Sequence, residues 1–261
     1  MGTAVRSEPV SADDIPYDDA GEQYYYGYRM TVTHNAEGVP FYSCRSLTLD
    51  DFLEPEEGDV YMQGNLHEDD VIRLRTVFRF HLRDRGNMTV YSDLKMIWGV
   101  RGLQNPAPDI SVIPDVTDPE RPRGSFSVQE EGVRPLFVLE VVSPRYRDAD
   151  ILRKPDIYRK AGVAEYVIVD PGLRKNRISY TVGGYRMSGS RYVKIEPDAQ
   201  GRIRSLTTGV LIGVNETGDR LVVLNAATGE EIPSDEERAD SAEEELRRLR
   251  ARLEAMGIST D

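Results

Sequence analysis

Three short segments near the middle of the chain decide its fold. They read PDISVIP at 108–114, PLFVLEVVSP at 135–144 and EYVIVDP at 165–171, and each ends in a proline. Apolar runs of this length are typical of central strands that are buried on both faces of a sheet. Residues 147–161 (RDADILRKPDIYRKA) lie between the last two runs and predict a helix, which Pro155 should kink or start late.

The flanking sequence extends this pattern. Residues 46–55 predict a short helix, 58–64 a strand, and 68–84 a longer helix with an apolar residue at every third or fourth position. From 173 to about 232, strand-like runs alternate with Gly, Asn and Asp turn signals at hairpin spacing. The order of elements predicts an α/β fold with a mixed central sheet flanked by helices and a β-hairpin extension.

Composition excludes several classes of protein. The chain has 261 residues, of which 39% are hydrophobic and 30% charged, which is a globular rather than a disordered composition. Its single cysteine, Cys44, excludes an intramolecular disulfide framework and a cysteine-rich zinc site. No apolar run is long enough to span a membrane, and the acidic N-terminus is unlike a secretory signal. We therefore expect a cytoplasmic protein without membrane association.

The net charge of −12 is concentrated at the two ends of the chain. One arginine and six acids give residues 1–26 a charge of −5, and five arginines and nine acids give residues 234–261 a charge of −4. Residues 27–233 therefore carry only −3. We expect an acidic tail over 1–26, a folded domain over 27–233 and a charged helix over 234–261. Because the central domain is near neutral, the net charge does not exclude a nucleic-acid partner.

Both ends carry apolar features that allow two interpretations. Three consecutive tyrosines at 24–26 either pack the tail on the domain, the more common role, or stack on bases. The C-terminal helix has a heptad seam, which either packs on its own domain or joins two copies in a homodimer. Its residues are Ala239, Ala242, Leu246, Leu249, Leu253 and Met256.

Two acids interrupt the apolar strands. Asp109 opens the strand at 108–114, and Glu140 lies inside the run at 135–144. A lone buried carboxylate is costly, so such acids are paired or bind a ligand. Carboxylate oxygens suit hard cations such as Mg²⁺ or Mn²⁺. Lys154 follows on the next predicted helix, in a basic stretch.

In this order, the three segments resemble the PD-(D/E)XK nuclease superfamily. Within it they are similar to the bacterial Uma-type (DUF820-like) family of putative restriction endonucleases. The resemblance extends through Tyr158, Gly162-Val163, Glu165-Tyr166 and Val169-Asp170-Pro171, and covers about 46–257. It departs from the family at Val167, where tryptophan is common.

The resemblance implies a restriction-endonuclease-like core and hydrolysis of phosphodiester bonds with a divalent metal. Asp109 and Glu140 would hold Mg²⁺ or Mn²⁺, together with the backbone carbonyl of Val141. Val142 stands where the standard motif has its lysine, and Lys154 on the following helix would replace it. The expected substrate is nucleic acid, with DNA as the main candidate.

Other residues are weaker candidates. His67 and Glu68 open the helix at 68–84 and could assist the site, although packing and helix-end roles are more common for them. The basic residues beside Glu140 suit a polyanion, although such runs are usually solvated faces. These are Arg145, Arg147, Arg153 and Lys160. The alternative function is a catalytically inactive nuclease-fold module for nucleic-acid binding or self-association.

Overall fold

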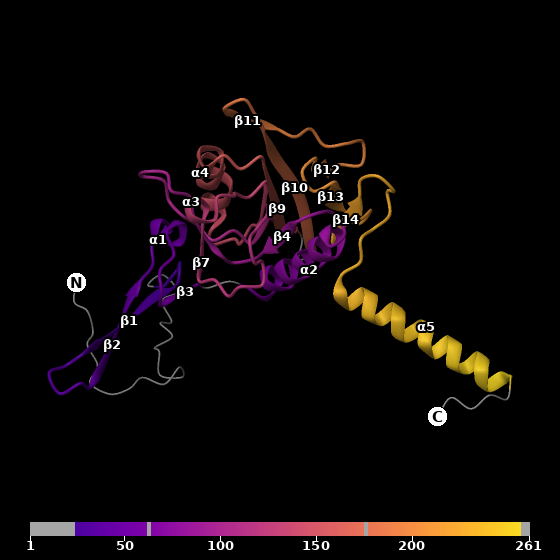
Figure 1. The fold of residues 1–261 in the computed structure, drawn as a ribbon, viewed down its shortest axis with the longest axis horizontal. Coiled ribbons are helices and arrows are strands. Elements are labelled where there is room, and N and C mark those ends of the chain that lie inside the picture. Colours follow the sequence, from indigo (N-terminus) through magenta and orange to yellow (C-terminus); the bar gives the residue numbers. More distant parts are fainter. Residues whose placement is uncertain (1–23, 62–63, 175–176, 257–261) are drawn as a thin grey trace.

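The computed structural model describes residues 24–61, 64–174 and 177–256, and its centre is a six-stranded sheet (Figure 1). Strands β8 and β9 run parallel, and the other neighbouring pairs in this sheet run antiparallel. The α/β class with a mixed central sheet is therefore confirmed. Across the sheet the order is β11 (Arg191–Lys194), β10 (Arg177–Ser188), β9 (Glu165–Arg174), β8 (Phe137–Val141), β6 (Ile110–Pro114) and β4 (Met88–Tyr91).

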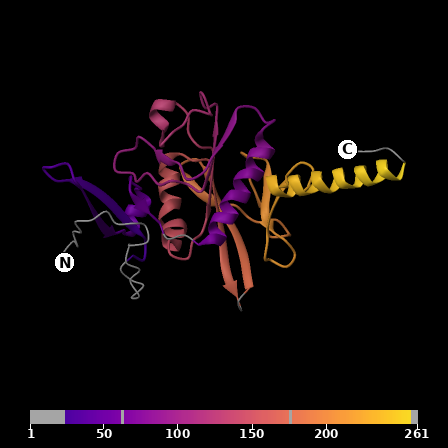
Figure 2. The same cartoon turned by 90° about the horizontal axis from the view of Figure 1, so that it is seen from below.

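Alternation along the central strands sends side chains into two separate cores. Val141 of β8 belongs to the core that packs under helix α2 (Asn65–Leu82). Val138 of the same strand belongs to the second core, which includes residues of helix α4 (Lys154–Ala161). Figure 2 shows these two helices on opposite sides of the sheet. Because Glu140 lies two residues after Val138, it faces the α4 side.

Two helices that flank the central sheet, α2 and α4, differ from their predicted bounds. Helix α2 begins at Asn65, three residues earlier than expected, after Gly64 in an extended conformation. Helix α4 follows a π-helical turn, η2 (Ala149–Arg153), and only then becomes regular. Pro155 therefore lies in the first turn of α4, where its missing N–H costs no helical hydrogen bond. Of the two outcomes expected from Pro155, a kink or a late start, the structure shows the late start of the regular helix.

The N-terminal part forms a separate small sheet. Its strands β1 (Tyr28–His34), β2 (Pro40–Ser46) and β3 (Asp59–Val60) have the order β2-β1-β3. Helix α1 (Leu49–Leu53) lies between β2 and β3 and is capped by Thr48. The strand predicted at 58–64 shortens to β3, and residues 62–63 lie outside the described part.

Tyr26, the last of the three tyrosines at 24–26, packs on the domain. The Tyr146 hydroxyl donates to the carbonyl of Tyr26 over 2.8 Å, and the two rings lie 5.8 Å apart. This contact favours the packing role over base stacking for Tyr26. The rest of the predicted acidic tail, residues 1–23, lies outside the described residues.

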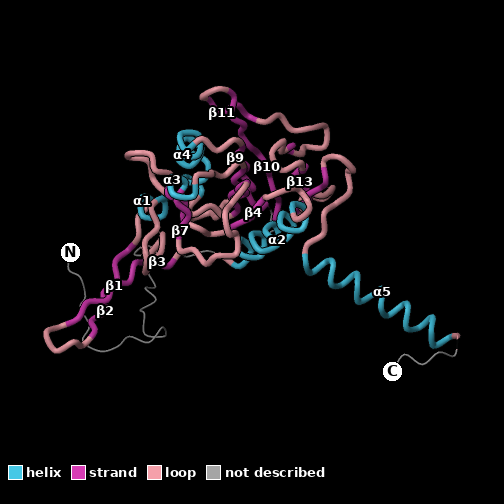
Figure 3. The backbone as a smooth tube through the Cα atoms, viewed as in Figure 1, coloured by secondary structure: helices cyan, strands magenta, loops and turns pink. Residues whose placement is uncertain are grey.

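Two smaller sheets and a last helix complete the fold (Figure 3). Strands β5 (Lys95–Ile97) and β7 (Ser125–Ser127) pair in parallel, and α3 (Val128–Glu131) follows β7. The predicted hairpin extension contains β12 (Ile203–Arg204), β13 (Val210–Val214) and β14 (Leu221–Asn225). Helix α5 (Asp235–Ala255) is the predicted charged C-terminal helix, and it extends away from the body (Figure 1). In the described ranges, no helix combines the length and hydropathy needed to cross a membrane.

Candidate active site

Two buried carboxylates stand opposite each other on neighbouring strands. Strands β6 and β8 are antiparallel, with Ile110 opposite Leu139, and the next pair in that register is Asp109 and Glu140. The N–H of Asp109 donates to Oε2 of Glu140 over 3.3 Å, and the N–H of Val141 donates to Oδ2 of Asp109 over 2.7 Å. Asp109 is 5% exposed and Glu140 is 1% exposed. The sheet therefore holds two acids in direct contact inside the protein.

Lys154 reaches the same point from helix α4. Its Nζ lies 3.0 Å from Oε2 of Glu140 and 2.7 Å from Oδ1 of Asp150, and the residue is 1% exposed. The ammonium group also lies 4.7 Å from the centre of the Phe52 ring, which belongs to α1. The structure thus brings together Asp109, Glu140 and Lys154, the three residues that the sequence singled out.

Two tyrosines fix the surroundings of this lysine. The hydroxyl of Tyr158 donates to Oε1 of Glu140. Tyr158 lies four residues after Lys154, so both side chains project from one face of α4. The Tyr166 hydroxyl donates to the backbone carbonyl of Asp150 over 2.7 Å and holds the π-helical turn against the sheet.

His67 contacts the site from α2, and Glu68 does not. Nε2 of His67 lies 3.4 Å from Oδ1 of Asp109, and the residue is 6% exposed. Its Nδ1 is buried, with no hydrogen-bond partner in the part of the chain that the structure describes. Burial lowers the pKa of His67, but Asp109 outweighs this effect and the pKa lies above its ordinary value. The side chain of Glu68 is exposed and lines a neighbouring hollow instead.

The pKa values of the two strand acids, Asp109 and Glu140, shift in opposite directions. Burial raises the pKa of Asp109, but hydrogen bonding and charge from His67, with the charge of Lys154, bring it below the ordinary value. Burial raises the pKa of Glu140 well above its ordinary value; Lys154 opposes this shift and Asp109 adds to it. One carboxylate is thus held ionised beside another that resists ionisation.

Lys154 is the shared cationic partner of two buried acids, Glu140 and Asp150. Burial lowers the pKa of Lys154, but Asp150 and Glu140 raise it above the ordinary value, so the amine stays protonated. Burial nevertheless raises the pKa of Asp150 to about 6, despite its contact with Lys154. The cluster therefore gathers three buried carboxyl groups around one ammonium group, and burial disfavours the ionised form of two of them, Glu140 and Asp150.

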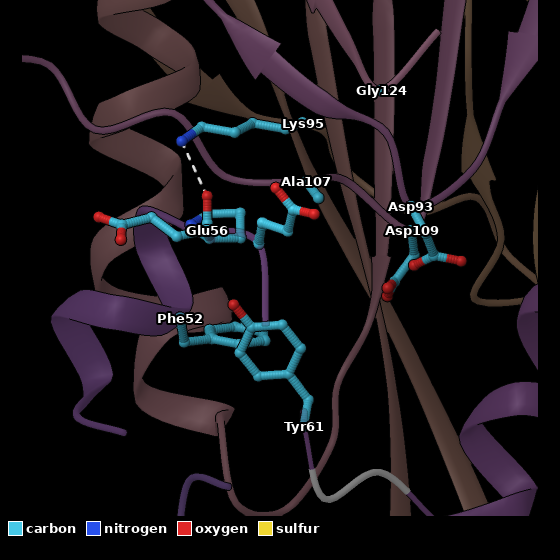
Figure 4. Close-up of a pocket in the computed structure, with 10 residues that line it drawn as sticks. Phe52, Glu56, Tyr61, Asp93, Lys95, Ala107, Asp109 and Gly124 are labelled. Carbon is cyan, nitrogen blue, oxygen red and sulfur yellow. Dashed lines mark hydrogen bonds between the residues drawn. The ribbon is translucent and has the colours of Figure 1, made fainter. Parts of the chain in front are cut away.

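Asp109 opens onto a hollow of about 650 Å³ (Figure 4). Phe52 and Tyr61 form an aromatic wall of this hollow, and Asp93 lies beside Asp109 in Figure 4. A second hollow of about 530 Å³ is lined by His67 and also by Tyr61 and Asp93. Partial desolvation and the nearby charge of Asp109 raise the pKa of Asp93 to about 6. A ligand in either hollow therefore meets carboxylate oxygens.

The carboxylate oxygens of the site fit a hard cation whose remaining ligands come from solvent or substrate. Among the described residues, no three His, Cys, Asp or Glu side chains form a metal-binding group. Mg²⁺ commonly binds through one or two carboxylates and completes its shell with water and substrate phosphate. In an extended strand the N–H and C=O of one residue point to the same side. Since the N–H of Val141 meets Asp109, the carbonyl of Val141 also faces that acid.

Sequence reasoning missed three residues around the site. Asp150 and Tyr158 lie four residues before and after Lys154, and this helical spacing was a usable signal. Asp93 sits in a loop with φ of +52°, and no periodic pattern marks it. Its place beside Asp109 depends on tertiary structure alone.

Each of the four basic residues proposed for nucleic-acid binding has a partner in the structure. Exposed ion pairs contribute little free energy, so phosphate could replace an acidic partner at small cost. The contacts are Arg145 with the carbonyl of Tyr25, Arg147 with Asp170, Arg153 with Asp50, and Lys160 with Asp156.

Comparison with known families gives one match that covers the whole site. The family Uma2, described as "Putative restriction endonuclease", matches residues 51–218. This range contains the site residues of α2, β6, β8 and α4, and it leaves out β1, β2 and α5.

A similar protein is found among the solved structures. It is the crystal structure of a putative nuclease belonging to DUF820 from Anabaena variabilis ATCC 29413, with 19% sequence identity and a TM-score of 0.42. The alignment covers 62% of this chain and 90% of the other. No curated protein matches the chain.

Proposed function

The chain belongs to the Uma2 family of putative restriction endonucleases, and from this premise we propose that it is a divalent-metal-dependent endonuclease that hydrolyses the phosphodiester bonds of DNA. One observation carries the proposal, namely the meeting of Asp109, Glu140 and Lys154 at one end of the sheet. A hydrolase of phosphodiesters needs to neutralise charge on the phosphate and to activate water. This cluster supplies oxygen donors and a fixed cation for these tasks.

The proposed metal ligands are Asp109, Glu140 and the carbonyl of Val141, with Mg²⁺ or Mn²⁺ as the metal. The raised pKa values of Glu140 and Asp150 support this assignment, because burial disfavours their ionised forms and a bound cation would favour them. A bound divalent cation supplies Lewis-acid polarisation of the phosphoryl group and lowers the pKa of water.

The remaining residues hold charge and orientation. Lys154 stays protonated, so it acts as a hydrogen-bond donor to developing negative charge and not as a base. Tyr158 donates to Glu140 and fixes the direction of its carboxylate. His67 contacts Asp109 and is an accessory residue that favours the ionised form of that acid.

The proposal extends to the rest of the chain. We assign the reaction to residues 27–233 and self-association to residues 234–261, so that a homodimer would carry two active sites. The four basic residues from Arg145 to Lys160 are proposed contacts for the phosphate backbone. A cytoplasmic location, where such an enzyme meets DNA, belongs to the same proposal.

Two observations favour the second candidate, an inactive nuclease-fold module that binds nucleic acid or associates with itself. The hollow in front of Asp109 also carries the acidic side chains of Glu56, Glu57 and Asp93, which repel phosphate. The described residues also lack a closed metal-binding group of three side chains. Both candidates predict nucleic-acid or self-association behaviour, but only the first predicts metal-dependent cleavage.

A cleavage assay separates the two. Purified protein is incubated with duplex DNA, single-stranded DNA and RNA, each with Mg²⁺, Mn²⁺ or EDTA. We expect metal-dependent cleavage of DNA, and a loss of at least about 100-fold in both Asp109→Asn and Lys154→Met. Lys194→Met is the matched control for the lysine, because Lys194 lies exposed on β11 away from the site.

The assay supports the proposal only if cleavage depends both on the divalent metal and on the site residues. Cleavage that persists in EDTA, or in both site variants, would overturn the assignment of the site. Isothermal titration with Mg²⁺ and Mn²⁺ gives a second readout that does not need a substrate. Heat of binding in wild type, and its loss in Asp109→Asn, is the expected result.

A further inference from the structure

Helix α5 exposes an apolar stripe that its own domain leaves uncovered. Within Asp235–Ala255, all of which the structure describes, no residue is buried. Leu246 is 48% exposed, Leu249 is 50% exposed, and Met256 just after the helix is 60% exposed. Figure 1 and Figure 2 both show the helix extending away from the sheet.

Only the first turn of α5 is anchored within the described part of the chain. Arg73 of α2 contacts Glu237 over 3.2 Å, and Arg238 lies 4.2 Å from the centre of the Phe80 ring. These contacts fix the direction in which α5 leaves the body. They do not reach the stripe, and most of the stability of a helix in a protein comes from the packing of its apolar face.

The two halves of the helix carry opposite charge. Residues 235–245 contain seven acids and one arginine, whereas residues 246–256 contain four arginines and one acid. Two such helices side by side in parallel would set acid against acid and arginine against arginine. Reversing one helix sets each acidic half against a basic half, which is favourable.

We propose that α5 pairs with α5 of a second copy in antiparallel orientation, with Leu246 of one helix opposite Leu249 of the other. This deepens the homodimer of the proposed function, since it rests on the same helix and adds its orientation. The overlap then runs over 239–256, or about 27 Å at the rise of an α-helix.

The sizes of the seam residues support this register. In the antiparallel pair, Ala239 lies opposite Met256 and Ala242 lies opposite Leu253, so every layer combines small with large or two leucines. In a parallel pair, two alanine layers would face themselves and leave one end of the interface thin. Layers that match large with small side chains fill the space between helices more evenly.

Charges beside the seam are compatible with the proposed pair. Glu243 would lie near Arg250 of the partner helix, and Glu245 near Arg252. These flanking contacts are also attractive when the helices are parallel, where Glu245 would meet Arg250. The orientation is therefore decided by the charge of the two halves and by the layer sizes.

Antiparallel pairing separates the two catalytic bodies. Each body is attached at the start of its helix, so the two attachment points would lie about 40 Å apart along the pair. A parallel pair would bring them to about 10 Å, the distance between packed helices. In the proposed dimer the two catalytic bodies therefore lie at opposite ends of the helix pair.

Disulfide trapping tests the orientation in the full-length protein. In a Cys44→Ser background, Ala239→Cys and Met256→Cys are introduced singly and together, and mild oxidation is followed on non-reducing gels. We expect a covalent dimer in the double variant and none in either single variant. Parallel pairing predicts instead that each single variant cross-links.

Light scattering tests the pairing itself. Wild type should have the mass of two chains, and Leu249→Asp should have the mass of one. Ala251→Asp is the matched control, because Ala251 is exposed on the opposite face of the same helix and should leave the dimer intact. Circular dichroism checks that both variants keep their helical content.

Each outcome has a defined consequence. A wild-type monomer, or a Leu249→Asp variant that stays dimeric, overturns the interface together with its orientation. A dimer in which Ala239→Cys alone cross-links overturns the orientation and leaves the dimer standing. Neither result depends on nuclease activity, so a failure here is distinct from a failure of the proposed reaction.

Discussion

Two glutamates on neighbouring parallel strands, Glu140 of β8 and Glu165 of β9, are each 1% exposed but have very different surroundings. Glu165 accepts hydrogen bonds from the hydroxyls of Ser205 and Thr207 over 2.5 and 2.6 Å. It also pairs with Nε of Arg186 over 2.7 Å. Burial raises the pKa of Glu165, but these hydrogen bonds outweigh it and the pKa lies below its ordinary value.

Glu140 lacks such compensation. It accepts hydrogen bonds from the hydroxyl of Tyr158 and the N–H of Asp109, and it shares the ammonium group of Lys154 with Asp150. Burial raises its pKa well above the ordinary value. A buried acid with a complete set of donors stabilises the fold, whereas one whose ionised form is disfavoured by burial is suited to bind a further cation.

Replacing each glutamate by glutamine tests this contrast, and we expect the largest difference between the two variants in the rate of DNA cleavage. We expect Glu140→Gln to lower the cleavage rate by more than the roughly 10–100-fold that loss of an outer metal partner costs. The variant removes a carboxylate from the proposed metal site and keeps the shape of the side chain. Initial rates of DNA cleavage at saturating Mg²⁺ measure the effect.

Glu165→Gln is the control for that measurement. Its carboxylate contacts the loop at 205–207 and not the candidate site, so the rate per folded molecule should stay within about twofold of wild type. Equal losses in the two variants would show that Glu140 acts through the fold and not through the reaction.

In stability, unlike in activity, Glu165→Gln should have the larger effect of the two variants. Glu165→Gln should lower the free energy of unfolding by about 2–3 kcal/mol at pH 7, because Arg186 and buried donors lose a charged acceptor. Since the pKa of Glu165 is lowered in the fold, its contribution is complete above about pH 4.5 and decreases as the pH falls further. Urea denaturation at pH 7 and near pH 4 measures the difference.

Glu140→Gln should not destabilise the metal-free protein comparably. A neutral amide avoids the cost of burying the ionised carboxylate of Glu140 and still accepts a hydrogen bond from Tyr158. A loss in Glu140→Gln as large as that in Glu165→Gln, measured in EDTA at pH 7, would remove the distinction between the two acids.

The sequence predicted the central strands and the acids on them for a simple physical reason. Strand periodicity is local, so Asp109 and Glu140 could be recognised as exceptions within apolar runs, and their register follows once the strands pair. The resemblance to the nuclease family supplied Lys154, and the π-helical turn before Pro155 brings that residue into the site. No propensity rule predicts such a turn.

The remaining site residues depend on how distant segments meet. Tyr158 and Asp150 share a helix face with Lys154 and were predictable in principle. His67 was named from its place at the start of α2, but its contact with Asp109 required the helix to cross the end of the sheet. Asp93 carries no sequence signal, because a loop residue between two strands has no periodic neighbours.

Replacing Asp93 should give the smallest change in stability, and the change should be a gain where Glu165→Gln gives a loss. Its pKa is raised to about 6 in the fold from an ordinary value of 3.8, so ionisation opposes folding as the pH rises through 6. Asp93→Asn should therefore stabilise the metal-free protein above pH 6, by about 1 kcal/mol or less because the side chain is exposed to screening solvent. Asparagine tolerates the positive φ at this position, so the backbone adds no strain.

Thermal or urea unfolding in EDTA at pH 4 and pH 7.5 measures this effect. Near pH 4 the carboxyl is largely protonated in the fold, so the variant should gain little there. A gain confined to the higher pH would group Asp93 with Glu140, as an acid held at a cost in stability beside Asp109. A loss at pH 7.5 would instead group it with Glu165, because it would mean that the ionised carboxylate of Asp93 contributes to the fold.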